Sequence, residues 1–312
     1  MSEGLSDIAL HRLIRKHGKP YAKLLAAYEE KFRTDPGTIL PTEIRLYKSK
    51  IFEATVIIDE AGMCTEPETL IPLVSVQPEQ VVLIGDHQQL RPIITEPIAK
   101  QLGMDISLLE KYKEKAEMLT TQHRMHHRIC EFPSSAFYNG KLRTAESVMR
   151  RGPDPIYSIW PNNGETPTVF CHVDGREDRL SVKSGEGNEG SKSNGAEIGY
   201  VIRIVQGMIS KGVSPEKIIV LSQYNLQCAQ IAERLKKNSS LRKIKVSTVV
   251  KSQGSEADYV IFSTVRSKPR NEIDEKPSKG WQKRHLGLIN DENQMNVALT
   301  RAKRGLIIVG KL

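Results

Sequence analysis

Residues 54–58 form the apolar, β-branched run ATVII, and two carboxylates, Asp59 and Glu60, follow it directly. A second apolar run, VVLI, occupies residues 81–84, and residues 66–76 between the two runs can form a helix. A buried strand, a helix and another buried strand make a parallel βαβ unit. The sequence therefore predicts an α/β fold with Asp59 and Glu60 at the carboxyl edge of a parallel sheet, where such folds bind ligands.

The rest of the chain alternates strands with helices. Residues 5–33 have a helical pattern and residues 35–37 form a turn, while residues 184–196 are predicted to be a polar loop and residues 268–287 a charged one. The remaining elements are strands at 168–170, 217–221, 244–249, 259–265 and 305–309, and helices at 197–210, 227–237 and 294–302. This alternation predicts two α/β domains with parallel sheets.

Composition and charge limit the class of protein. The 312 residues include 46 Lys and Arg against 37 Asp and Glu, a formal net charge of +9. Residues 1–116 carry 15 basic and 17 acidic side chains, whereas residues 117–312 carry 31 and 20, so a polyanion partner is expected for the second part. The four cysteines form no CxxC pair, which argues against a zinc site or a disulfide framework.

Targeting and membrane signals are not evident in the sequence. No apolar run approaches the ~20 residues that a membrane span needs, and the opening MSEGLSDIAL does not have the shape of a signal peptide. We therefore expect a soluble intracellular protein, cytoplasmic or nuclear, without a membrane partner.

The second apolar run ends in GDHQQ at residues 85–89. Gly85 allows a sharp turn, and the side chains after it are expected beside Asp59 and Glu60. In phosphoryl-transfer sites one carboxylate holds Mg²⁺, directly or through water, and a second polarises the attacking water. A glutamine at this place can hydrogen-bond a γ-phosphate. An isolated Asp-Glu pair is usually only an acidic turn, but two such strand ends together favour a nucleotide site.

Three further stretches follow in order. They are QHRMH at residues 122–126, residues 249–258 with the sequence QGSE at 253–256, and NVALTRAK at residues 296–303. Together with the two strand ends, these elements resemble the motifs of superfamily 1 helicases, in the subgroup that includes the nonsense-mediated-decay helicase. The resemblance covers about residues 51–312 and implies two RecA-like parallel-sheet domains, the first of them incomplete.

The resemblance also implies roles for individual residues. Helicases of this family hydrolyse ATP with Mg²⁺ in the cleft between the two domains, and single-stranded RNA or DNA crosses the tops of both sheets. An arginine suits the cleft because its planar, permanently charged fork bridges phosphate oxygens. The matching residues are Asp59 and Glu60 for Mg²⁺ and water, Gln89 for the γ-phosphate, Arg124 and Arg301 as cross-cleft arginines, and Glu256 for a further nucleotide contact.

One departure from the family pattern concerns a single side chain. His123 stands where the family usually has tyrosine. Both side chains can stack, so we expect a changed affinity rather than a lost one. A metal site formed by His123, His126 and His127 is an alternative, but the family pattern already accounts for these residues.

The second departure is larger. The sequence contains no GxxxxGK[ST] loop, so none of its residues cradles the β- and γ-phosphates with backbone N–H groups and a lysine. The family places this loop upstream of Asp59 and Glu60, where the present residues have a helical pattern instead. Two explanations stay open: a fragment or splice product of a longer helicase, and a degenerate relative that does not hydrolyse ATP.

These observations predict the C-terminal motor region of an NTP-dependent RNA or DNA helicase. Residues 1–116 are expected to form a partial first RecA-like domain and residues 117–312 the second. The alternative is a non-catalytic nucleic-acid- or protein-binding module, for example in a coactivator. The missing phosphate loop favours this alternative, while the enzyme is favoured by the presence of Asp59, Glu60, Arg124 and Arg301.

Overall fold

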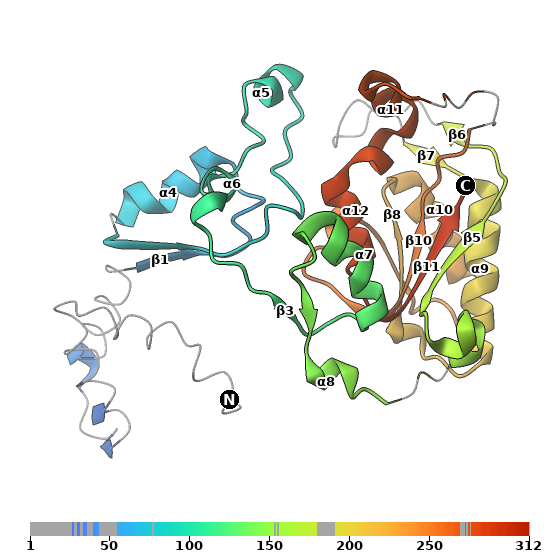
Figure 1. Cartoon of the computed structure of the whole chain (residues 1–312), viewed down its shortest axis with the longest axis horizontal. Helices are drawn as coiled ribbons and strands as arrows, with labels where there is room; N and C mark the ends of the chain where they lie inside the picture. Colours follow the sequence, from blue (N-terminus) through green and yellow to red (C-terminus); the bar gives the residue numbers. More distant parts are fainter. Residues whose placement is uncertain are drawn as a thin grey trace.

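A computed structural model describes most of the chain from residue 55 onward (Figure 1). The helices predicted within residues 5–33 and the turn at 35–37 fall largely outside the described residues. The described residues are 55–311 without 77, 153, 155, 180–190, 269–271, 273 and 275, together with isolated positions between 27 and 43.

The first sheet is the predicted βαβ unit. Strands β1 (Thr55–Ile58) and β2 (Gln80–Leu83) pair in parallel, and α4 (Glu66–Val76) connects them. The prediction that both strands are buried is wrong, because Ile57 and Val81 are 44% and 43% exposed. In the described residues this sheet has two strands, with α4 packed against β1, so much of its surface stays uncovered.

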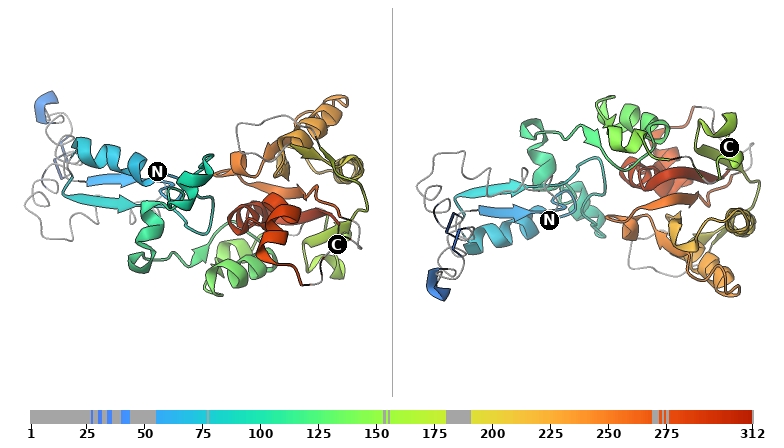
Figure 2. Two further views of the ribbon diagram at one scale, coloured as in Figure 1. Left: turned by 90° about the horizontal axis from the view of Figure 1, so that it is seen from above. Right: turned by 90° about the horizontal axis from the view of Figure 1, so that it is seen from below.

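A long connection leads from the first sheet to the second (Figure 2). It contains the short helices α5 (Pro97–Gln101) and α6 (Leu108–Lys111), and then the small parallel pair β3 (Thr121–Gln122) and β4 (Arg143–Thr144). Between β3 and β4 lies α7 (His127–Tyr138), which the sequence did not predict because Pro133 interrupts its pattern. After β4 comes α8 (Glu146–Met149).

The second sheet has five parallel strands in the order β5-β11-β10-β8-β9, which confirms the predicted α/β class. Each strand predicted in this half is present, with ends that differ by a few residues. The bounds are β5 Thr168–His172, β8 Ile218–Ser222, β9 Lys245–Thr248, β10 Ala257–Ser263 and β11 Ala302–Gly310. The predicted helices are α9 (Gly195–Ser210), α10 (Asn225–Lys236) and α12 (Glu292–Leu299).

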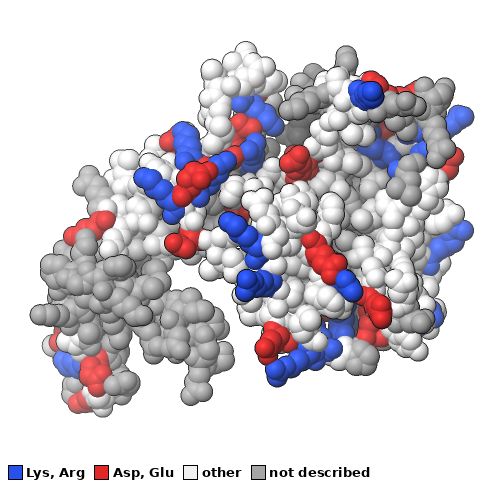
Figure 3. Space-filling view, in the orientation of Figure 1, with Lys and Arg blue, Asp and Glu red and all other residues white. Residues whose placement is uncertain are grey.

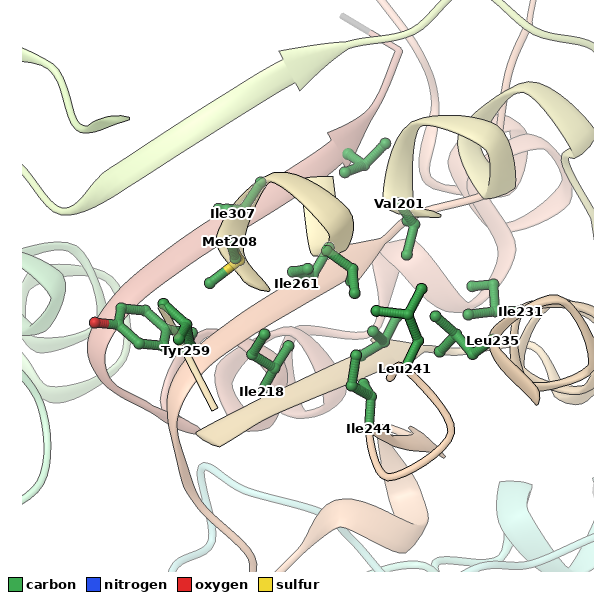
Figure 4. Packing of buried hydrophobic residues seen from close by; sticks show 14 of the residues in the cluster. Val201, Met208, Ile218, Ile231, Leu235, Leu241, Ile244, Tyr259, Ile261 and Ile307 are labelled. Atoms are coloured by element: carbon green, nitrogen blue, oxygen red, sulfur yellow. The ribbon is translucent and has the colours of Figure 1, made fainter. Parts of the chain in front are cut away.

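Helices cover both faces of this sheet. Alternate residues of β8 and β10 point to opposite sides, as the pleat of a strand requires. On one side, residues such as Ile218 and Ile261 pack against Val201 of α9 and Ile231 of α10 (Figure 4). On the other side, residues of the same strands pack against α7 and α12. Burial on both faces explains why these strands have continuous apolar sequences.

Two predicted loops are partly ordered into secondary structure. The charged loop at 268–287 contains α11 (Lys279–Leu286), whose first turn is capped by the Ser278 side chain. The polar loop at 184–196 ends in β7 (Lys192–Ser193), which pairs antiparallel with β6 (Asp178–Arg179). Both loop predictions are wrong at these positions. The side-chain cap stabilises α11 and pairing with β6 stabilises β7, although both segments are polar in composition.

Candidate functional site

The carboxyl ends of β1 and β2 lie against each other. The N–H of Ala61 donates to the carbonyl oxygen of Ile84 at 2.8 Å, and a Cβ on Gly85 would lie 3.0 Å from the nitrogen of Ala61. Glycine therefore allows the close approach of the two turns. Asp59 and Glu60 are exposed at this edge, and Glu60 has a φ of 52°. The structure thus places both carboxylates at the sheet edge where the sequence predicted them.

Asp86 organises the loop that follows β2. One carboxylate oxygen accepts a hydrogen bond from the N–H of Gln88 at 2.9 Å. The other accepts from the side-chain amide of Gln89 at 2.9 Å and from the hydroxyl of Tyr138 at 2.6 Å. Burial and the negative charge of Asp86 raise the pKa of Tyr138 above its ordinary value, so the hydroxyl remains a donor. Asp86 thereby ties the loop to the last residue of α7.

Residues 86–90, named here the 86–90 loop, are also held by α12. The side-chain amide of Asn293 donates to two backbone carbonyls of the loop at 2.6 and 3.0 Å, and that of Asn296 donates to a third at 2.9 Å. Leu90 is buried among apolar side chains of α7 and α12. The loop therefore begins in the first sheet but packs against the elements of the second.

Arg301 lies at the junction of α12 and β11 and is 2% exposed. Its guanidinium donates to the carbonyl oxygens of Val297 at 3.0 Å and Ser255 at 3.5 Å, to the hydroxyl of Thr300 at 3.1 Å, and to the side-chain carbonyl of Gln89 at 3.1 Å. These described acceptors are all uncharged. Burial lowers the pKa of Arg301 to about 10, so the side chain is still positive at neutral pH.

Arg124 and Glu256 form an ion pair beside Arg301. The Nε of Arg124 donates to Oε2 of Glu256 at 2.7 Å, and Nζ of Lys303 lies 2.6 Å from Oε1. The hydrogen bonds from Lys303 and Arg124 lower the pKa of Glu256 to about 2. The positive charge of Arg124 contributes to the lowered pKa of Arg301, so the two guanidinium groups are close enough to repel each other.

Gln253 joins the first sheet to the second. Its Nε2 donates to Oε2 of Glu60 at 2.8 Å, and its own Oε1 is buried without a hydrogen-bond partner among the described residues. Gln253 lies in the QGSE stretch, but its contact with Glu60 spans 193 residues of sequence. Sequence reasoning missed this role, as it missed those of Asp86, Tyr138, Asn293 and Asn296, because all of them depend on long-range contacts.

The predicted site residues are thus connected in pairs. Gln89 contacts Arg301, Arg124 contacts Glu256, and Glu60 is linked to the second sheet through Gln253. The Asp59 carboxylate accepts from the N–H of Glu60 at 2.9 Å. The described contacts do not join Asp59 to the arginines.

The donor set can be tested for Mg²⁺. This ion usually takes one or two protein carboxylates together with waters and substrate phosphates. Two adjacent exposed carboxylates, Asp59 and Glu60, fit that mode. Within the described residues there is no group of three or more His, Cys, Asp or Glu that could hold a metal ion by itself.

Two parallel α/β units, with strand-end carboxylates on one and the half-buried Arg124 and buried Arg301 on the other, define the class of RecA-like motor domains. Family models described as "AAA domain" match residues 8–97 and 104–312. The chain belongs to this family, among the superfamily 1 helicases, which confirms the resemblance seen in the sequence.

Named relatives support this membership. The human "3'-5' exoribonuclease HELZ2" is 40% identical over 343 residues, which cover 99% of this chain and 12% of that protein. The Arabidopsis thaliana "Regulator of nonsense transcripts 1 homolog" is 35% identical over 94% of this chain and 22% of its own length. The "ATP-dependent helicase NAM7" of Saccharomyces cerevisiae is 36% identical over 82% and 25%. The chain spans a quarter or less of each of these three proteins.

Two structural observations complete the comparison. The solved structure of the PRRSV helicase covers 82% of this chain and 34% of its own, with 14% identity and a TM-score of 0.38, a likeness too low to add to the family assignment. None of the described helices is long and apolar enough to cross a membrane.

Proposed function

We propose that this chain is part of a helicase motor, with a nucleoside-triphosphate site between its two sheets and single-stranded nucleic acid across both. In this proposal residues 1–116 belong to the first RecA-like domain and residues 117–312 form the second. The observation that carries the proposal is the position of Arg301. This arginine of the second sheet's part of the chain is buried and positive, and it donates a hydrogen bond to Gln89, which follows the first sheet. A buried charge is costly unless it is paired, and a γ-phosphate is the counter-charge that fits here.

The proposed site assigns a task to each predicted residue. Asp59 and Glu60 hold Mg²⁺ and orient the attacking water, and Gln89 contacts the γ-phosphate. Bound Mg²⁺ supplies positive charge to the phosphate oxygens. Arg124 and Arg301 add further positive charge from the second domain, and Glu256 contacts the nucleotide. In the structure Glu256 already holds Arg124, so it also sets the orientation of this arginine.

This division of the site couples hydrolysis to movement. The carboxylates belong to residues 1–116 and the arginines to residues 117–312, so the reactive arrangement is complete only when the two parts are close together. The 86–90 loop supports this coupling, because it leaves the first sheet and is held by α7 and α12. A change at the γ-phosphate would reach α12 through Gln89.

The alternative is a binding module that does not hydrolyse nucleotide. The 312 residues contain no GxxxxGK[ST] loop. Hydrolysis therefore needs a phosphate cradle from a segment beyond them. Without this cradle the same surfaces bind nucleic acid or a protein and perform no chemistry.

Nucleic-acid binding by the chain tests the proposal. Residues 117–312 carry 31 basic and 20 acidic side chains, although acidic and basic groups are interspersed on the face shown in Figure 3. We expect weak binding of single-stranded RNA, micromolar or weaker, with little sequence preference. For about three to five phosphate contacts, log affinity should fall against log salt with a slope of roughly −2 to −3.5.

Fluorescence anisotropy of a labelled oligonucleotide over a salt series measures this slope. A single-stranded oligomer and its duplex of the same length provide the matched pair of ligands. If binding is absent even at low salt, or if its salt dependence is flat, the protein-binding alternative replaces the proposal.

A further inference from the structure

Strand β10, the middle strand of the second sheet, ends in a strained turn. Val265 has a φ of 69°, in the left-handed region, and the N–H of Arg266 donates to the carbonyl of Thr264 at 2.7 Å. A hydrogen bond across one residue with positive φ is a γ-turn of the rare, strained kind. Val265 is β-branched and fully buried, so this conformation is especially unfavourable for it. Such strain persists only where the surrounding structure imposes it.

A buried glutamate imposes it here. Oε2 of Glu197, on α9, accepts hydrogen bonds from the N–H of Val265 at 2.9 Å and from the hydroxyl of Ser263 at 2.6 Å. The side chain of Asn194 donates to the carbonyl of Val265 at 3.2 Å. Both backbone groups of the strained residue are therefore held by side chains of another element. Gln227 of α10 completes the network through Ser263 at 2.8 Å.

The charged groups at this end of the sheet are engaged elsewhere. Nζ of Lys192 lies 5.8 Å from the ring centre of Tyr224, and Arg266 pairs with Glu177 at 2.8 Å. Uncharged donors hold Glu197, and burial raises its pKa to about 7.

This turn lies at the opposite end of β10 from the nucleotide residues. Glu256 immediately precedes the strand, whereas Val265 follows its carboxyl end. The carboxyl edge is where parallel sheets bind ligands. At this edge Thr264, Ser267 and Lys268 are partly exposed. The two hydroxyl groups can donate to a phosphate backbone, and the ammonium group of Lys268, which pairs with Glu272 at 2.7 Å, can exchange that carboxylate for a phosphate.

We infer that Glu197 is a positioning residue: its carboxyl holds the turn at Val265 in the shape that the carboxyl edge of β10 presents to single-stranded nucleic acid. The inference rests on the proposed function, because it adds a determinant to the same nucleic-acid surface. Glu197 itself is buried and touches no nucleic acid.

Two substitutions separate the geometry from the charge. Glu197→Asp keeps the carboxyl but is one methylene shorter, so it withdraws the acceptor from the N–H of Val265. Glu197→Gln keeps the length and an acceptor oxygen but cannot ionise. Tyr259→Phe is the matched control, because it removes a hydrogen bond of 2.5 Å to the carboxylate of Asp154, away from the carboxyl end of β10. The affinity of the full chain for fluorescein-labelled oligouridine is measured at low salt, with melting temperatures alongside.

We expect Glu197→Asp to weaken RNA binding about tenfold, the equivalent of one hydrogen bond, while Glu197→Gln and Tyr259→Phe stay within about twofold of the parent. Hydrogen exchange at the amides of residues 264–268 should be faster in Glu197→Asp than in the other variants. Should Glu197→Asp fail to fold, Ser263→Ala takes its place, with a smaller loss of affinity expected.

Equal RNA affinity in Glu197→Asp and Tyr259→Phe overturns the inference, since it leaves Glu197 a role in stability alone. Weak binding by Glu197→Gln with normal binding by Glu197→Asp also overturns it, because charge would then be the cause. A parent chain that does not bind RNA defeats the proposed function itself, and this result is distinct from both.

Discussion

Glu197 and Glu256 have pKa values displaced in opposite directions. Hydrogen bonds from Lys303 and Arg124 lower the pKa of Glu256 to about 2, whereas burial raises that of Glu197 to about 7. Glu256 is therefore a permanent negative charge that orients an arginine. Glu197 is a carboxyl that the fold prefers to keep protonated. The two residues are both glutamates, so only their neighbouring side chains in the fold distinguish their pKa values.

The raised pKa of Glu197 predicts a pH dependence of stability. Its ordinary value is 4.5, so the folded chain binds this proton more tightly than the unfolded chain. The stabilising contribution is fully present below pH 4.5 and is lost as the pH rises through about 7. The side chain in Glu197→Gln cannot ionise. The free energy of unfolding of this variant, relative to that of the parent, should therefore rise between about pH 5 and about pH 8, by on the order of 2–3 kcal/mol at most.

Urea unfolding of both proteins at the two pH values measures this gain. Glu233→Gln, at an exposed position of α10 where Lys237 pairs with it at 3.2 Å, is the control and should run parallel to the parent. Parallel curves for Glu197→Gln and the parent would contradict the raised pKa.

At the scale of elements, the pattern of apolar residues predicted those helices and strands that are formed by apolar runs. The helix at 66–76 has the predicted bounds, and the strands of both sheets lie within a few residues of theirs. Pattern failed where a helix depends on neighbours: α7 contains Pro133, and α11 lies within a charged stretch. It also could not show that the 86–90 loop packs on α7 and α12, because that contact joins distant parts of the chain.

Tyr138→Phe tests the attachment of this loop. The change removes the hydroxyl that donates to Asp86 at 2.6 Å and keeps the aromatic ring at the end of α7. A hydrogen bond to a charged group contributes about 1.5–3 kcal/mol, so the amides of residues 86–90 should exchange at least about tenfold faster with solvent. Amides of β8 and β10 should keep their protection.

Hydrogen exchange followed by mass spectrometry resolves the two regions. Tyr157→Phe, at an exposed tyrosine, is the matched control. Unchanged exchange in the 86–90 loop would show that Asn293, Asn296 and Leu90 hold it without Tyr138.

At the scale of the whole molecule, the two sheets differ in completeness. The second has five strands with helices on both faces, whereas the described first sheet has two strands with half-exposed side chains. The motifs predicted the family and the strand-end carboxylates, because each motif is a short run of consecutive residues that can be recognised without the fold. The pairing of Gln89 with Arg301, and of Gln253 with Glu60, became visible only in the fold.

The missing phosphate loop predicts that the 312-residue chain hydrolyses ATP no faster than background. Without backbone N–H groups and a lysine around the β- and γ-phosphates, most of the charge neutralisation is lost. Phosphate release with and without single-stranded RNA measures the rate. RNA-stimulated hydrolysis that survives purification and disappears in Glu60→Gln would show that this chain supplies its own cradle.

The central claim is that an arginine from the second domain completes an ATP site. The direct test is the turnover of a longer polypeptide that contains these 312 residues and a GxxxxGK[ST] loop, compared with its Arg301→Ala variant. Arg128→Ala, at an exposed residue of α7, is the control. We predict that Arg301→Ala lowers RNA-stimulated turnover by roughly 10³–10⁵ while RNA affinity without nucleotide changes little, because the arginine acts on the developing phosphate charge. Turnover within a few-fold of the parent would contradict the claim.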